Sequence, residues 1–143
     1  MPPTPPLSSS SAARALIAVG AAALAFGSAA QSHTGDQVYE AVCARCHAQG
    51  VEKAPKTGDR KAWAPLIREG QAALTGIAWV GIRGMPARGG DHTLPLEDFA
   101  RPTAHMARAA GATWADPDEA LLQRIRVLEK RRLEQLRKAR SAG

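Results

Sequence analysis

Aromatic side chains are scarce in this chain of 143 residues, where three Trp, one Tyr and two Phe make up only 4%. Aromatic rings bury more apolar surface than other side chains, so a domain with few of them has little material for a core. Either the core is small, or a bulky apolar cofactor completes it. The length suits one domain with extensions, because domains usually run about 100–150 residues. It argues against a membrane channel or a multidomain enzyme.

Cysteine is also scarce, with only Cys43 and Cys46 present. Two cysteines exclude a disulfide-dense scaffold, which needs several bridges in a short chain. The sequence also lacks any useful stretch in which polar and apolar residues alternate, so no β-sheet is expected. It contains no internal repeat. The expected fold class is therefore all-α.

The first thirty residues predict a leader rather than part of the fold. Residues 2–13 are rich in Pro and Ser, and Arg14 precedes an apolar run that ends in small residues. This order is typical of a secretory signal peptide over residues 1–30, cleaved after Ala30. An uncleaved membrane anchor is the alternative, although a spanning helix needs about 20 clearly apolar residues.

The globular unit is predicted over residues 31–111, with helices joined by glycine-rich loops. The first helix is expected to have Asp36 as N-cap and to run into the two cysteines. The others are expected from Pro65, at a first helical position, to a stop at Gly70; over 71–80; and over 96–110 with one buried stripe. Pro102 lies in the middle of the last helix and should kink or interrupt it.

Residues 112–143 predict a separate helical tail, in which Asp116 is the N-cap and Pro117 the first helical residue. Leucine and isoleucine lie on one face of this helix and basic residues on the rest. Arg132 falls within the apolar face, which weakens a coiled-coil seam. The helix could fold back on the domain, pair with a partner helix or bind an anionic membrane surface.

The net charge of +6 is that of the last 23 residues of this tail. Residues 31–120 hold ten Lys and Arg against eleven Asp and Glu, whereas residues 121–143 hold eight Lys and Arg against two Glu. The globular unit is thus close to neutral. It has no basic face that would indicate a nucleic-acid partner.

The chemistry is concentrated in Cys43-Ala44-Arg45-Cys46-His47, the C-x-x-C-H pattern of c-type haem attachment. Two thiols three residues apart at a helix end can each add to one vinyl group of a porphyrin. The next residue then presents an imidazole to the iron from the same side, and iron with a proximal His requires a sixth ligand.

Three other readings of the cysteines compete with haem attachment. A thioredoxin-like dithiol would sit at the start of a helix after a strand, and no strand is expected here. A structural zinc site needs four ligands, for which His92 or His105 would have to be recruited. A plain disulfide would leave His47 without a role.

Met85 is the candidate sixth ligand. It lies in the loop Gly84-Met85-Pro86 followed by Gly89-Gly90, whereas methionine usually packs as a gap filler on helical faces. His92 and His105 are weaker candidates. Met106 falls on the apolar stripe of its helix and is expected in the core.

Together these residues resemble the class I cytochromes c, and more closely the small bacterial monohaem cytochromes of the c-five type. The resemblance runs from Gly35 to Gly90, and loosely to Gly111. Its motifs are Gly35-x-x-Val38-Tyr39, Cys43-x-x-Cys46-His47, Gly50-Val51, Ala54-Pro55-Lys56, Gly58-Asp59, Ala62-Trp63-Ala64-Pro65 and Gly84-Met85-Pro86 with Gly89-Gly90.

The resemblance implies a compact all-α fold around one covalent haem, with the first and last core helices crossing. It implies thioether bonds at Cys43 and Cys46 and axial ligation by His47 and Met85. In this family a Pro carbonyl orients the axial imidazole and a Trp lies near a haem propionate. By motif position these are Pro55 and Trp63.

The expected function is one-electron transfer in the periplasm, with other redox proteins as partners and no enzymatic activity of its own. The haem iron (haem c) would have both axial positions filled by protein. A haem enzyme or sensor with a labile sixth ligand is the alternative. Another is a haem domain held at a partner or at the membrane by residues 116–143.

Overall fold

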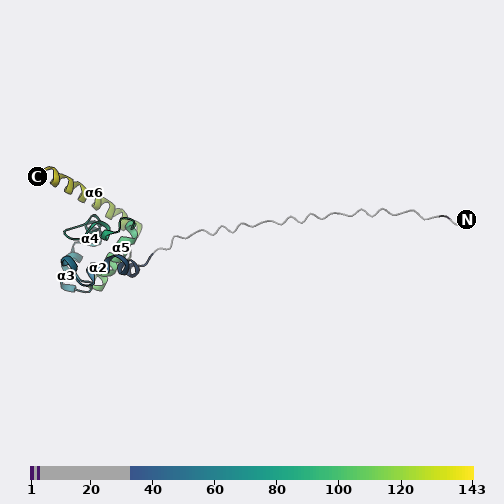
Figure 1. The fold of residues 1–143 in the computed structure, drawn as a ribbon, viewed down its shortest axis with the longest axis horizontal. Coiled ribbons are helices and arrows are strands. Elements are labelled where there is room, and N and C mark those ends of the chain that lie inside the picture. Colours follow the sequence, from purple (N-terminus) through teal and green to yellow (C-terminus); the bar gives the residue numbers. More distant parts are fainter. Residues whose placement is uncertain (2, 4–32) are drawn as a thin grey trace. The chain divides into compact units, whose positions relative to one another are not determined.

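The computed structural model describes residues 1, 3 and 33–143 (Figure 1). The predicted signal peptide over 1–30, with its cleavage after Ala30, lies outside the described residues apart from Met1 and Pro3. Among the described residues, no helix combines the length and the apolar character needed to cross a membrane.

The described chain is helical and forms no strand, and its one β-type pairing is an isolated bridge between Ile82 and Met85. The predicted all-α fold is therefore confirmed. The first helical segment passes from α1 (Gly35–Val38) through a five-residue π-helix, η1 (Tyr39–Cys43), into α2 (Ala44–His47). It is followed by η2 (Val51–Lys53), α3 (Arg60–Arg68), α4 (Gln71–Val80), η3 (Ala87–Gly90), α5 (Leu96–Ala109) and α6 (Glu119–Ser141).

Both of the predicted N-caps are wrong, and in each case a better cap lies close by. The first helix is capped by Thr34, not Asp36: the Gln37 amide N–H donates to the Thr34 hydroxyl, while the Thr34 N–H donates to the Gln37 side chain. This reciprocal pair satisfies two backbone N–H donors at once. In α6 the cap is Asp118 rather than Asp116, and its carboxylate accepts from the Leu121 N–H at 2.7 Å.

The start predicted at Pro65 is also wrong, because α3 begins five residues earlier. The Asp59 carboxylate accepts from the backbone N–H groups of Lys61 and Ala62, at 3.0 and 3.1 Å, and so caps the helix at Arg60. Pro65 lies inside α3 on its exposed side. Gly70, with φ of 88°, follows the helix end, as predicted.

The first and last core helices cross at Gly35. A Cβ atom at that position would lie 2.8 Å from the Arg101 carbonyl oxygen and 3.3 Å from His105 Cβ, so only glycine allows this approach. One turn later the Tyr39 ring packs against the His105 ring, with centroids 5.3 Å apart. The crossing fixes the helix that leads to Cys43 directly against α5.

Pro102 does not interrupt α5, contrary to the prediction. The helix runs continuously from Leu96 to Ala109, and Pro102 is among the fully buried side chains. A proline inside a helix removes one backbone hydrogen bond and costs about 3 kcal/mol. Burial of most of one face of α5 outweighs this, since each large apolar side chain contributes about 1.5–3 kcal/mol. Arg101 also pairs with Glu97 and Asp98, across the turn that the proline weakens.

Three apolar clusters make up the core. The first holds Tyr39, Cys43, Trp63, Leu74, Met106, Ala107 and Ala110. The second holds Val38, Ala78, Trp79, Leu94 and Phe99, with the partly buried Met85 packed against it. The third joins Ala100 of α5 to Leu121, Leu122 and Ile125 of α6. The few aromatic rings of the described chain therefore lie in or against the core.

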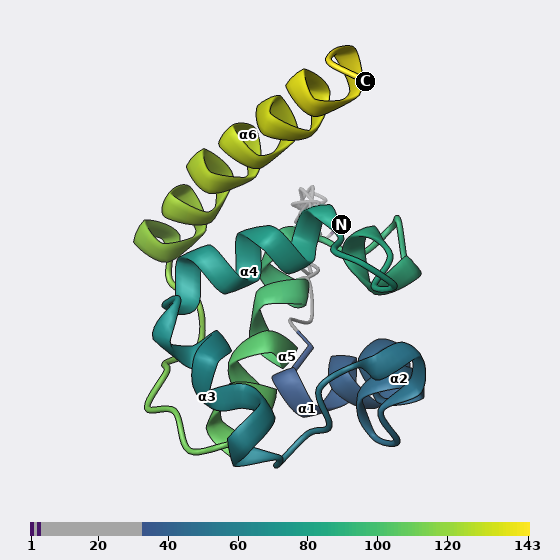
Figure 2. The same ribbon diagram turned by 90° about the vertical axis from the view of Figure 1, so that its left-hand side faces the viewer.

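The tail helix is bound to the domain through its first half. Its buried side chains reach the third cluster, and its Leu128 Cβ lies 3.3 Å from where a Cβ of Gly76 in α4 would stand. Leu133, by contrast, is 48% exposed. Figure 2 shows α6 (yellow-green) beginning beside α4 and projecting beyond it toward the C-terminus.

This division of α6 predicts unequal effects of two truncations. We expect Ile125→Ala to lower the free energy of unfolding by about 2–5 kcal/mol, because a fully buried side chain would leave a cavity. Leu133→Ala, two turns along the same helix, should change it by less than about 0.5 kcal/mol. Denaturant unfolding measures both. Equal effects at the two positions would show that the first half of α6 is not packed as described.

Candidate functional site

The two cysteines and the histidine lie at the end of the first helical segment. Cys43 ends the π-helix, and Cys46 and His47 end α2, so the three follow each other at the i, i+3 and i+4 spacing of one helix face. Single π-turns often mark functional sites. Cys43 and His47 are buried and Cys46 is partly buried. The two thiols are free, so the plain disulfide is not formed.

The environment of Cys43 is apolar. It belongs to the first core cluster, with Trp63 and Leu74. Burial, and secondarily the neighbouring Cys46, raises the pKa of the Cys43 thiol to about 11. A reactive dithiol requires the opposite, a lowered thiol pKa. The site therefore does not have the electrostatics of a thioredoxin-like redox pair.

His47 is held by the loop that follows it. Its Nδ1 lies 2.9 Å from the Pro55 carbonyl oxygen, and since a carbonyl can only accept, Nδ1 is the protonated nitrogen. The backbone of the same loop returns to the helix, where the Thr57 N–H donates to the His47 carbonyl at 2.8 Å. This arrangement fixes the tautomer and leaves Nε2 with a free lone pair for a metal.

Trp63 anchors this loop from α3. Its indole N–H donates to the Lys56 carbonyl at 2.8 Å, and its ring centroid lies 6.3 Å from that of His47. At 2% exposure it is one of the most buried side chains of the first cluster. Pro55 and Lys56 are adjacent, so the loop is held at neighbouring carbonyls by His47 and by Trp63.

Met85 is presented by a tight turn. Ile82 and Met85 exchange two backbone hydrogen bonds, of 3.0 and 2.9 Å. The side chain packs against the second core cluster. Pro86 then leads into the 3-10 turn η3.

The loop that carries Met85 touches the segment that carries His47 at several points. A Cβ at Gly89 would lie 3.0 Å from Val42 Cγ1, and one at Gly90 would lie 3.6 Å from the Arg45 guanidinium. A Cβ at Gly84 would lie 3.3 Å from that of Glu52. The fold thus brings both candidate ligand segments together, although their sequence separation is large.

The weaker ligand candidates lie in other surroundings. His92 is exposed, and the ring of His105 packs on Tyr39 at the helix crossing. Met106, 3% exposed, is in the first core cluster. In the part of the chain that the structure describes, no three His, Cys, Asp or Glu side chains gather as a metal cluster would require. A zinc site built from the two cysteines is therefore not formed.

The residues present fit a covalently attached haem. The two thiols are free, and the His47 imidazole has its Nε2 available for a metal. The turn that presents Met85 lies against the helical segment that ends in His47. The sequence did not predict a further residue of the site, Thr57. Its hydroxyl is buried and has no hydrogen-bond partner among the described residues. A buried polar group without a partner calls for an additional ligand or water. No sequence pattern distinguishes Thr57 from other loop threonines.

Comparison with known proteins agrees with this geometry. The family described as "Cytochrome C oxidase, cbb3-type, subunit III" matches residues 30–106. The cytochrome c-555 of Chlorobaculum tepidum is 39% identical over 94 residues, which cover 62% of this chain and 87% of the relative. The chain belongs to the cytochrome c family. The cytochromes c-555 of Chlorobaculum thiosulfatiphilum and Prosthecochloris aestuarii are 38% and 35% identical, each over 50% of this chain and over 88% and 81% of the relative.

A solved structure supports the same family at the level of the fold. The chain matched comes from a structure titled "Crystal structure of electron transfer complex of nitrite reductase with cytochrome c". It is 39% identical, with a TM-score of 0.51, and the match covers 53% of this chain and 93% of the other. This cytochrome c is therefore a small class I member with a covalent c-type haem, and a haem-based electron carrier. The family match ends at residue 106, so α6 lies wholly beyond it.

The Trp63 hydrogen bond predicts a measurable loss of stability. Trp63→Phe keeps a buried ring but leaves the Lys56 carbonyl without its donor, and should lower the free energy of unfolding by about 1 kcal/mol. Trp114→Phe is a matched control, since its indole N–H donates to no group of the described chain. Equal losses in the two variants, measured by denaturant unfolding, would contradict a specific role of the Trp63 N–H.

Proposed function

We propose that this cytochrome c is a periplasmic one-electron carrier, attached to its haem through Cys43 and Cys46 and ligating the iron with His47 and Met85. The observation that carries the proposal is the placement of two segments. The helix ending in His47, with its imidazole oriented by the Pro55 carbonyl at 2.9 Å, touches the loop that presents Met85.

Each residue has a defined task in this proposal. The Pro55 carbonyl keeps the proton of His47 on Nδ1 and raises the basicity of Nε2 as a ligand. Trp63 fixes the loop to which Pro55 belongs, and its ring stands close enough to His47 to restrict the imidazole. Its predicted place near a propionate remains part of the proposal. The bound haem supplies the change between ferric and ferrous iron, and Met/His ligation raises its reduction potential.

The carrier has no catalytic residue in this scheme. His47 and Met85 would together hold the iron, which would leave no position for oxygen or a substrate. The alternative, a haem enzyme or sensor with a labile sixth ligand, requires Met85 to leave the iron easily. The turn that holds Met85 by two backbone hydrogen bonds favours the carrier.

The proposed location follows from the leader, residues 1–30, read as a cleaved signal peptide. The partners would be other redox proteins, met through small and transient contacts. The projecting end of α6 favours partners with an acidic face, since residues 130–143 carry six Lys and Arg against one Glu. An anionic membrane surface remains the second candidate for this end.

Covalent attachment is tested by a pyridine haemochrome spectrum of protein made in a periplasm with haem-maturation machinery. We expect a c-type spectrum that survives acid–acetone extraction. The double variant Cys43→Ala, Cys46→Ala should lose the haem and fail to fold, because the aromatic-poor core lacks the apolar bulk that the porphyrin supplies. A stable, helical double variant without haem would contradict this dependence.

The sixth ligand is tested by Met85→Leu, which keeps the side-chain volume packed on the second cluster but removes the sulfur. We expect the reduced variant to bind carbon monoxide readily and its reduction potential to fall. The unaltered protein should bind carbon monoxide only when denatured. If the unaltered protein binds it equally well, Met85 is not a firm ligand and the labile-ligand alternative stands.

A further inference from the structure

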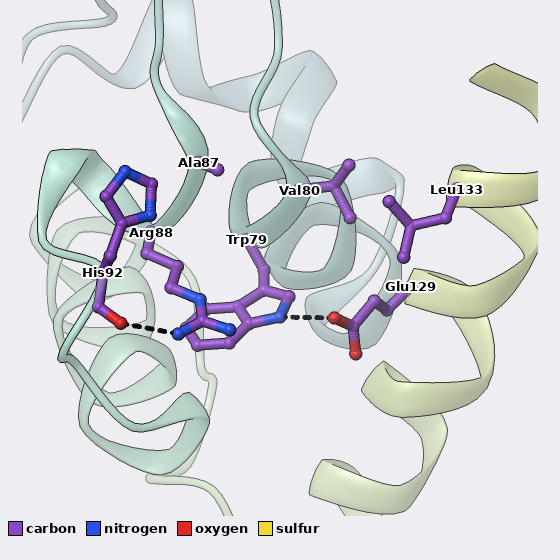
Figure 3. A pocket seen from close by; sticks show the side chains of 7 residues that line it. All are labelled: Trp79, Val80, Ala87, Arg88, His92, Glu129 and Leu133. Carbon is purple, nitrogen blue, oxygen red and sulfur yellow. Dashed lines mark hydrogen bonds between the residues drawn. The ribbon is translucent and has the colours of Figure 1, made fainter. Parts of the chain in front are cut away.

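The helix that lies beyond the family match is connected to the loop that carries Met85. The connection runs through Trp79, near the end of α4, as Figure 3 shows. Its indole N–H donates to the Glu129 carboxylate of α6 at 2.8 Å. Trp79 is 6% exposed, and the edge-to-face contact with Phe99, at 5.4 Å between centroids, fixes the plane of its ring. A hydrogen bond to a charged acceptor is stronger than one between neutral groups.

Arg88 completes the connection on the other side of Trp79. Its guanidinium carbon lies 4.5 Å from the centre of the indole, within the range of a cation–π contact. Its Nη1 donates to the His92 carbonyl at 2.7 Å, so the side chain joins two points of the loop to the ring (Figure 3). Arg88 is three residues from Met85.

The backbone of this loop needs such support. Arg88 has a φ of 54°, in the left-handed region that costs a non-glycine residue energy and persists only where its surroundings impose it. Gly89, at φ of 67°, continues the same conformation. Gly81 allows the loop to lie on the end of α4, since a Cβ there would stand 2.9 Å from the Ala87 nitrogen.

A groove of about 380 Å³ lies between α6 and the loop that carries Met85, and it is lined by Trp79, Val80, Ala87, Arg88, His92, Glu129 and Leu133. At this groove, α6 is linked to the loop through a hydrogen bond and a cation–π contact that share the indole of Trp79 (Figure 3).

We propose that Glu129 is a positioning residue for Met85: by fixing the Trp79 ring under Arg88, it holds the loop in the conformation that keeps the thioether on the haem iron. This inference rests on the proposed function, in which Met85 is the sixth ligand. It assigns α6 a role within the electron-transfer site, in addition to its contact with the core.

The test measures how easily an external ligand replaces Met85 in the ferric holoprotein. Imidazole titration is followed by loss of the long-wavelength charge-transfer band from the methionine sulfur to ferric iron. Glu129→Ala should bind imidazole about tenfold more tightly, the factor that a hydrogen bond to a charged group is typically worth. Glu129→Gln retains an oxygen acceptor for the indole, but a neutral acceptor is worth about half as much as a charged one, so this variant should bind imidazole only about threefold more tightly than the unaltered protein.

Three further variants separate positioning from general stability. Glu134→Ala removes an exposed carboxylate of the same helix and should leave imidazole affinity unchanged. Trp79→Phe keeps a ring but removes the N–H, and should raise imidazole affinity as Glu129→Ala does. Because the two variants remove the same hydrogen bond from opposite sides, either can serve if the other folds poorly. Adding Arg88→Ala to Glu129→Ala should give less than the product of the two single effects, because both act through one ring.

The outcomes distinguish this inference from the proposed function. If the unaltered protein lacks the methionine charge-transfer band, the assignment of Met85 fails. If the band is present but Glu129→Ala and Trp79→Phe bind imidazole as the unaltered protein does, the positioning role is overturned and the carrier function stands. Lower unfolding stability with unchanged imidazole affinity would likewise overturn it, since that is what a purely structural contact produces.

Discussion

The close approach of two backbones at Gly35 determines where the rest of the site can be. The absence of a side chain there lets the first helix lie directly on the Arg101 carbonyl of α5. From this contact the same helical segment runs through a π-turn to Cys43, Cys46 and His47. The proposed haem attachment segment is therefore positioned by the core itself, and not by a loop that could adjust independently.

Two of the few aromatic residues hold the loops beside the proposed iron ligands. Trp63 donates its N–H to the loop that orients His47, and Trp79 donates to Glu129 while supporting Arg88 in the loop of Met85. In each case a ring in the core carries one donor to another segment: Trp63 to the loop at Lys56, and Trp79 to helix α6 at Glu129. An indole suits this task because it combines a large apolar surface with a single donor. The scarcity of other aromatic residues fits a core that a porphyrin would complete.

The sequence predicted correctly those features that depend on interactions between residues close in the chain. The helix over 71–80 has the expected bounds, and the pentapeptide from Cys43 to His47 indicated the family. The errors arose where two local signals competed: Thr34 prevailed over Asp36 as a cap, and Asp59 over Pro65 as a helix start. The helix around Pro102 is continuous because of tertiary packing, since burial against neighbouring helices outweighs one missing hydrogen bond. The link between Trp79 and Glu129, which are 50 residues apart, has no sequence signature at all.

The half-docked α6 also separates charge along the molecule. Residues 31–120 are nearly neutral, while residues 121–143 hold eight Lys and Arg against two Glu. Six of these basic residues, against one Glu, lie in residues 130–143 at the projecting end of the helix. Such an arrangement has a large permanent electric dipole moment, even though the net charge is modest. A dipole experiences a torque in the field of an acidic protein or surface before contact. The carrier would therefore arrive with α6 leading, so that its orientation is selected during approach and not after collision.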